Sequence, residues 1–303
     1  MDQKITVGYD STESSVESVM WAAHEAGVRK LPLRIVSCFG MPVLTSAGPL
    51  GWGAGEAFDA ERTAATQGLQ EIRATVEAVH PDLSFTTELS SGPVEEVLLE
   101  GIGPHDLVVV GASSHPGAAA FWLGNTPRHL VRHSPCAIVV VRGPASRGGP
   151  DRVVVGIDGS ATADRALRWA ADEADLHHTG LLVVHTWSVP LGNDLETVRD
   201  LARIDAACAL EAAVESARER CGATVESLLV ETGPVEGLLD AVRDGDVLVL
   251  GSRGRGALRS GLFGSTVNGV LDAAAVPVVV VREEPSDDPG DTQGRSAGLA
   301  SVG

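Results

Sequence analysis

The sequence repeats itself, and this duplication limits the possible folds more than any other feature. The segment that begins at Val7 lines up with the segment that begins at Val155, and both carry a matching tryptophan, Trp21 or Trp169. Both copies end on a valine-rich run closed by an arginine. A repeat of about 140 residues is a duplicated domain and not the short unit of a solenoid. We predict domains over residues 1–143 and 151–284, a linker over 144–150 and a disordered tail over 285–303.

Within each copy, apolar runs alternate with amphipathic segments. In the second copy the run over 152–157 is mainly apolar, as a strand covered on both faces requires. Apolar residues at helical spacing follow over 164–176. Strands are also expected over 181–185, 225–230, 247–250 and 278–281, and helices over 195–220, 235–242 and 265–274. This alternation predicts an α/β fold with two tandem doubly wound, Rossmann-like domains, each with a five-stranded parallel sheet. Ligands of such sheets bind at the carboxyl ends of the strands.

Composition excludes several classes of protein. Hydrophobic residues make up 44% of the chain, which is too many for a disordered protein. No apolar run approaches the roughly 18 residues that a membrane-spanning helix needs. The formal net charge of -18 repels nucleic acid and anionic lipid, so neither is an expected partner. The four cysteines form no CxxC pair and no signal peptide is apparent, so we expect reduced thiols in a cytoplasmic protein.

One glycine-rich loop carries the candidate chemistry. After the strand over 247–250, the second copy reads Gly251-x2-Gly254-x9-Gly264-Ser265, and a helix is expected to begin at Ser265. Glycines allow positive φ and let backbone amides approach phosphate oxygens. The hydroxyl and amide of Ser265 would lie at the positive end of the helix dipole. The loop has no Walker lysine, so it is not a P-loop. Its positive charge comes from Arg253, Arg255 and Arg259.

This spacing resembles the ATP-binding signature of the universal stress protein family, G-x2-G-x9-G-[ST]. Asp158, which ends the first strand of the second copy, and the final run over 276–282 match the family too. The resemblance implies a fold of the adenine nucleotide alpha hydrolase type, with ATP, AMP or ADP as ligand together with Mg²⁺. It implies that Asp158 faces the ribose and phosphates or holds the metal ion, and that the backbone of Thr186 contacts adenine. It assigns ribose and phosphate binding to Gly251, Gly254, Gly264, Ser265 and Thr266.

The first copy keeps the register of this loop but changes its residues. Ser114 stands where the second copy has Gly254, and Pro127 falls just inside the expected helix. A Cβ atom at Ser114 crowds the phosphates or forbids the required φ. We therefore expect the first copy to bind nucleotide more weakly or not at all. Its candidate binding residues are Asp10, Gly111, Gly124 and Asn125.

Three functions are compatible with these features. The first is an ATP-binding regulatory protein with little or no turnover, because the loop supplies no obvious general base or nucleophile. The second is a slow Mg-dependent ATPase or phosphotransferase, in which Asp158 holds Mg²⁺ and the loop stabilises the transferred charge. The third is a scaffold that acts through an unknown protein partner, or a binder of cyclic AMP.

The last strand of each copy, over 137–141 and 278–281, is expected at a sheet edge. Exposed valine-rich edges favour pairing. In the family that the chain resembles, such strands pair domains, so we expect the copies to pack against each other and the same edges to offer a route to a homodimer.

Three histidines stand out as candidate ligands. His129 and His133 are four residues apart on an expected helix, the spacing of two metal ligands on one face. No third ligand accompanies them, so we expect a role at the helix end. His185 ends a core strand, where a structural hydrogen bond is expected.

Overall fold

The computed structural model of the chain describes residues 3–39, 54–112, 124–143, 149–189, 196–254 and 264–282. Most of the expected linker and the whole of the expected tail lie outside these residues, as do Ser114, Arg255 and Arg259. All four cysteines are described, and all are free thiols as expected. Among the described helices, none combines the length and the apolar character that crossing a bilayer requires.

Strands and helices alternate along the whole chain, which confirms the expected α/β class. The first half contains β1 (Ile5–Gly8), α1 (Glu13–Arg29), β2 (Leu33–Phe39), α2 (Ala54–Val79), β3 (Phe85–Ser91), α3 (Val94–Leu99), β4 (Leu107–Gly111), α4 (Asn125–His133) and β5 (Ala137–Val141). The second half contains β6 (Arg152–Ile157), α5 (Ala161–Leu176), β7 (Gly180–Trp187), α6 (Glu196–Arg220), β8 (Val225–Glu231), α7 (Pro234–Ala241), β9 (Asp246–Gly251), α8 (Ser265–Ala273) and β10 (Val278–Val281).

Each half forms the five-stranded parallel sheet that the sequence predicts. The strand order is β3-β2-β1-β4-β5 in the first half and, in mirror sequence along the sheet, β8-β7-β6-β9-β10 in the second. The chain reverses its direction of winding at β1 and at β6: β2 and β4 lie on the two sides of β1, and β7 and β9 lie on the two sides of β6. Each half therefore has one switch point, where ligands of doubly wound folds bind.

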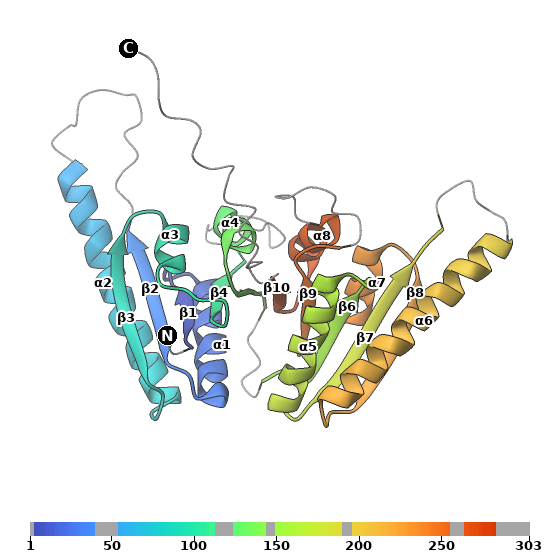
Figure 1. Cartoon of the computed structure of the whole chain (residues 1–303). Coiled ribbons are helices and arrows are strands. Elements are labelled where there is room, and N and C mark those ends of the chain that lie inside the picture. The colour runs from blue at the N-terminus through green and yellow to red at the C-terminus, as the bar shows by residue number, and fades with distance from the viewer. Residues whose placement is uncertain are drawn as a thin grey trace, which may run out of the picture.

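The two halves are joined into a single ten-stranded sheet. Strand β5 pairs with β10 in antiparallel fashion, with Val139 opposite Val279 (Figure 1). This confirms the expected pairing of the copies through their last strands. It also corrects the expected route to a homodimer, because both strands have a neighbour on each side and neither offers a free edge to a second chain. The free edges of the sheet belong to β3 and β8.

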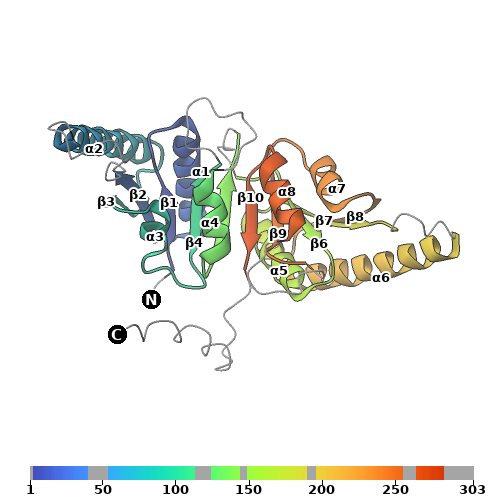
Figure 2. The ribbon, with the colours of Figure 1, turned by 90° about the horizontal axis from the view of Figure 1, so that it is seen from above.

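Helices cover both faces of this sheet. Buried residues of α1, α2, α5 and α6 pack on one face, and buried residues of α3, α4, α7 and α8 pack on the other. Each of these two cores contains residues from both halves, so the packing continues across the junction. Seen from above, α4 and α8 flank the β5–β10 pair, while α2 and α6 lie toward the two outer ends (Figure 2).

Candidate functional site

The structure brings together three predicted binding residues of the second half, Asp158, Gly254 and Gly264. They lie at the carboxyl ends of the neighbouring strands β6 and β9. Asp158 follows β6, and the loop that starts at Gly251 follows β9. A Cβ atom on Gly254 would lie 2.5 Å from Oδ2 of Asp158, so only a glycine brings the loop backbone this close to the carboxylate. A Cβ atom on Gly264 would lie 3.9 Å from the backbone nitrogen of Gly254. The two ends of the loop therefore meet beside Asp158.

The start of the loop is fixed to the beginning of α5. A Cβ atom on Gly251 would lie 2.7 Å from the backbone carbonyl carbon of Thr162, so glycine is required by close packing. The hydroxyl of Thr162 donates to the carbonyl oxygen of Arg253, and the hydroxyl of Ser160 donates to the same oxygen at 3.4 Å. These bonds set the direction in which the loop leaves the sheet.

Asp158 is itself oriented by the turn into α5. Its Oδ1 accepts a hydrogen bond from the Ser160 amide at 3.0 Å, and Gly159 between them has a φ of 73°. Ser160 also caps α5 by accepting from the Ala163 amide at 3.2 Å. The sequence run Asp-Gly-Ser held this signal, but sequence reasoning gave no role to Ser160 or Thr162.

Helix α8 begins at the other end of the loop, and no side chain of the described residues caps its first turn. Gly264 is its N-cap residue and supplies no side-chain cap, while Ser265 is exposed and Thr266 half-buried. The first turn contains no acidic side chain. Since the first amides of a helix have no partner within the helix and lie at its positive end, this turn suits an anion.

Thr186 lies on the other side of Asp158. It follows His185, which is in register with Ile157, so Thr186 and Asp158 leave the sheet at matching positions of β7 and β6. Nδ1 of His185 donates to the Ile157 carbonyl at 2.8 Å, which confirms a structural role for this histidine. The order β9, β6, β7 thus places Asp158 between the glycine loop and Thr186.

The first half repeats the frame of this site with different details. Gly111 packs against α1, because a Cβ atom there would lie 2.5 Å from the Ser14 hydroxyl. The Gly124 amide donates to the Ala112 carbonyl at 2.9 Å and closes the loop on itself. Asp10 is exposed, and its Oδ1 accepts from the amide of Thr12 at 3.1 Å.

The start of α4 differs from the start of α8 in the donors that it can supply. Asn125 and Thr126 open the helix, and the buried Pro127 comes third, where α8 has Val267. Proline has no N–H group, so this helix presents one backbone donor fewer. The start of α4 is therefore poorer in backbone groups for an anion than the start of α8.

The histidine pair of α4 behaves as a helix-end pair. Nδ1 of His133 donates to the carbonyl of His129 at 2.9 Å, and the two rings lie 4.1 Å apart. Within the described ranges, no third metal-ligating side chain joins them.

Comparison with known proteins points to one family. The family model described as "Universal stress protein family" matches residues 1–142 and 150–282. A universal stress protein from Mycolicibacterium smegmatis is 36% identical over 288 residues, covering 92% of this chain and 96% of its own. The crystal structure of a universal stress protein from Archaeoglobus fulgidus has a TM-score of 0.67 at 18% identity and covers 92% of this chain and 98% of its own. Another structure from that organism, solved in complex with dAMP, covers only 43% of this chain with a TM-score of 0.34.

Proposed function

The chain belongs to the universal stress protein family, and from this membership we propose that it is a regulatory protein that binds ATP, or the related AMP or ADP, in its second half. We further propose that the two repeats are domains over residues 1–143 and 151–284. The predicted binding residues are Asp158, Thr186, Gly251, Arg253, Gly254, Gly264, Ser265 and Thr266.

The observation that carries this proposal is the approach of a bare loop backbone to Asp158. Gly254 lies where any side chain would collide with Oδ2 of that carboxylate. With Gly264 beside it and the first turn of α8 following, backbone amides can surround phosphate oxygens without interference from Cβ atoms. In a chain with a formal net charge of -18, this local geometry and Arg253 must supply the attraction for an anion.

Asp158 suits a Mg²⁺ ion that would accompany the phosphates. Mg²⁺ in nucleotide sites is usually held by one or two carboxylates together with phosphate oxygens and water. One oxygen of Asp158 is held by the Ser160 amide, which orients the other toward the glycine backbone. Asp158 would thus bind the ion from the protein side, and the ion would neutralise phosphate charge next to the carboxylate.

We expect the second half to bind more tightly than the first. Asp10 is exposed, whereas Asp158 is half-buried against the loop. Pro127 also removes a donor from the start of α4. One bound nucleotide per chain is the expected stoichiometry.

Two glycine variants test the proposal. In Gly254→Ala the new Cβ atom displaces the Asp158 carboxylate, a side-chain end that can swing aside, so we expect the fold to survive and ATP affinity to fall at least about tenfold, or 1.4 kcal/mol. Gly233→Ala is the matched control, because a Cβ atom there meets nothing within 4 Å. Calorimetric titration with Mg·ATP and mass spectrometry of nucleotide retained from cells provide the readouts. Wild-type protein that neither retains nor binds an adenylate would refute the proposal.

A hydrolysis assay separates a binder from a slow ATPase. The described residues of the glycine loop supply no obvious general base or nucleophile, so we expect phosphate release to be slow or absent. Asp158→Asn should weaken Mg·ATP binding and should not increase the rate of phosphate release. Turnover in the wild type that Asp158→Asn abolishes would favour the enzyme instead.

A further inference from the structure

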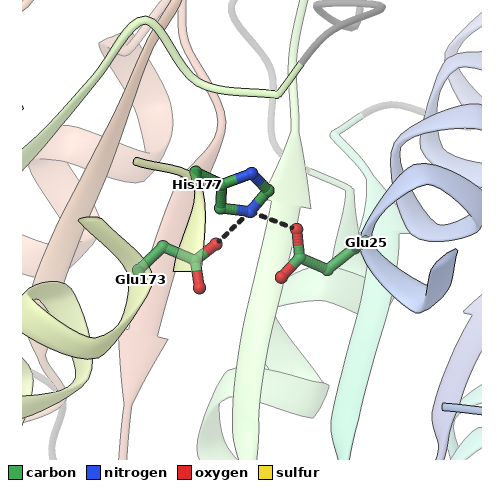
Figure 3. A group of neighbouring side chains, drawn as sticks. All are labelled: Glu25, Glu173 and His177. Carbon is green, nitrogen blue, oxygen red and sulfur yellow. Dashed lines mark hydrogen bonds and ion pairs between the residues drawn. The ribbon is translucent and has the colours of Figure 1, made fainter. Parts of the chain in front are cut away.

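A group of charged side chains is buried where the two halves meet, at the end of the sheet opposite the glycine loops. Glu25 lies near the end of α1, and Glu173 and His177 lie at the end of α5. Their side chains are 2%, 1% and 4% exposed. Figure 3 shows both carboxylates directed toward the same ring nitrogen of His177.

The group follows the internal repeat. Glu25 and Glu173 occupy matching positions in the two copies, and so do Arg29 and His177. The guanidinium of Arg29 binds Oε1 of Glu25 and, across the junction, Oε2 of Glu173. Nε2 of His177 lies 3.0 Å from Oε2 of Glu25 and 3.4 Å from Oε1 of Glu173. Each carboxylate therefore gives one oxygen to Arg29 and turns the other toward His177.

The second copy has histidine, His177, where the first copy has arginine, Arg29. This difference changes what the buried cluster can bind. A guanidinium has five donors and no lone pair to offer, whereas neutral imidazole presents a nitrogen lone pair. One nitrogen and two carboxylate oxygens thus face each other, all within 4.8 Å. Oε1 of Glu173 is fully buried, and among the described residues it has no well-aligned hydrogen bond beyond its 3.4 Å approach to Nε2 of His177.

The surroundings orient these three groups. Arg29 holds the far oxygens of both glutamates and lies 5.5 Å from the centre of the Trp169 ring. The ring of His24 stacks on that of His177 at 5.8 Å. Such hydrogen bonds and packing around a set of ligands fix the direction of their lone pairs.

We propose that Glu25, Glu173 and His177 form a binding site for a divalent transition-metal ion such as Zn²⁺, which links the two halves of the chain. Zn²⁺ accepts histidine nitrogen and carboxylate oxygen together and completes its coordination with water. Mg²⁺ and Ca²⁺ prefer oxygen ligands alone. The site lies at the other end of the sheet from the nucleotide loop and does not depend on the proposed function.

A proton on His177 is the competitor for this position. Burial alone lowers the pKa of His177, but the hydrogen bonds and negative charges of Glu173 and Glu25 raise it to about 9. A metal ion must therefore displace this proton, and the titration is best made near pH 9, where about half of the imidazole is already neutral.

The test uses the full chain after removal of metals with a chelator. Titration with Zn²⁺ against a chromophoric chelator should give one bound ion per chain, and Co²⁺ should give the visible absorption of a low-coordinate site with nitrogen and oxygen ligands. His177→Asn should weaken Zn²⁺ binding at least tenfold. His178→Asn is the matched control, because His178 is exposed and its φ of 53° suits asparagine.

A second readout does not depend on variants that could fail to fold. Bound Zn²⁺ at the junction should raise the thermal unfolding temperature of the wild type. The proposal is overturned if the wild type binds no Zn²⁺ in stoichiometric amount, if Zn²⁺ leaves the unfolding temperature unchanged, or if folded His177→Asn binds as tightly as the wild type.

Discussion

Replacing Arg29 by methionine should destabilise the chain far more than removing an exposed arginine. Methionine retains the apolar stem but removes the guanidinium that binds Glu25 and Glu173. Both glutamate side chains are almost fully buried, and removing one partner of a buried ion pair costs about 3–5 kcal/mol. Arg29 is itself 25% exposed and His177 remains as a second partner, so we expect a loss near the lower figure, about 3 kcal/mol.

Arg220→Met is the matched control for this prediction. Arg220 forms two bonds of 2.6 Å to Asp172, but the two side chains are 42% and 57% exposed. Exposed ion pairs contribute about 0–1 kcal/mol. Arg220→Met should therefore lose little stability, even though the hydrogen bonds of the Arg220–Asp172 pair are short.

Thermal unfolding of chelator-treated protein, followed by circular dichroism, compares the two variants. We expect Arg29→Met to lower the unfolding temperature by about 5–10 °C, from the usual relation between free energy and midpoint in domains of this size. Arg220→Met should lower it by no more than about 3 °C. Equal losses in the two variants would refute the account of a buried charge cluster that holds the halves together.

Three further predictions concern the second half and the thiols. Ser160→Ala removes the cap of α5 and should cost about 1 kcal/mol in denaturant unfolding; an unchanged midpoint would contradict the role of the cap. Gly251→Ala places a Cβ atom 2.7 Å from the backbone of α5 and should cost about 1–3 kcal/mol, whereas Gly27→Ala inside α1, where a Cβ atom meets nothing within 4 Å, should not lower the thermal midpoint; similar losses would contradict the close packing. Burial raises the pKa of Cys136 to about 11 while Cys208 is exposed, so iodoacetamide at pH 8 should label Cys208 first by peptide mass spectrometry, and faster labelling of Cys136 would count against its burial.

Most of the fold could be predicted because local patterns determine it. Runs such as Val153–Val155 are apolar on both faces, and a strand covered by helices on both sides requires this. Because the sequence is duplicated, the elements predicted in one half also predict those of the other half. The start of α5 was predicted three residues late, at Asp164, because the capping hydroxyl of Ser160 extends the helix toward the strand.

The candidate site was partly visible in the sequence. The spacing from Gly251 to Ser265 predicts a glycine-rich loop, and the structure brings Gly254 and Gly264 together beside Asp158. The hydrogen bonds from the Ser160 and Thr162 hydroxyls to the Arg253 carbonyl could not be predicted. Hydroxyl groups near the start of a helix have many possible partners, and only the packed loop selects one.

The junction cluster could not be predicted from local patterns. Glu25 and Glu173 are matching residues of the repeat, but their meeting depends on how the ends of α1 and α5 pack once β5 and β10 have paired. His177 stands next to His178 in the sequence, and nothing local indicates that the side chain of the first is buried while the second residue is exposed. Such long-range meetings require the assembled sheet.

Amide hydrogen exchange with and without Mg·ATP tests the central claim most directly, because it locates the nucleotide along the chain. We predict that ATP slows exchange in residues 251–254 and 264–267 and in the turn from Asp158 to Ser160, and leaves residues 111–112 and 124–127 of the first half unchanged. Protection confined to the first half, equal protection in both halves, or none at saturating ATP would contradict the claim that the glycine loop of the second half holds the nucleotide.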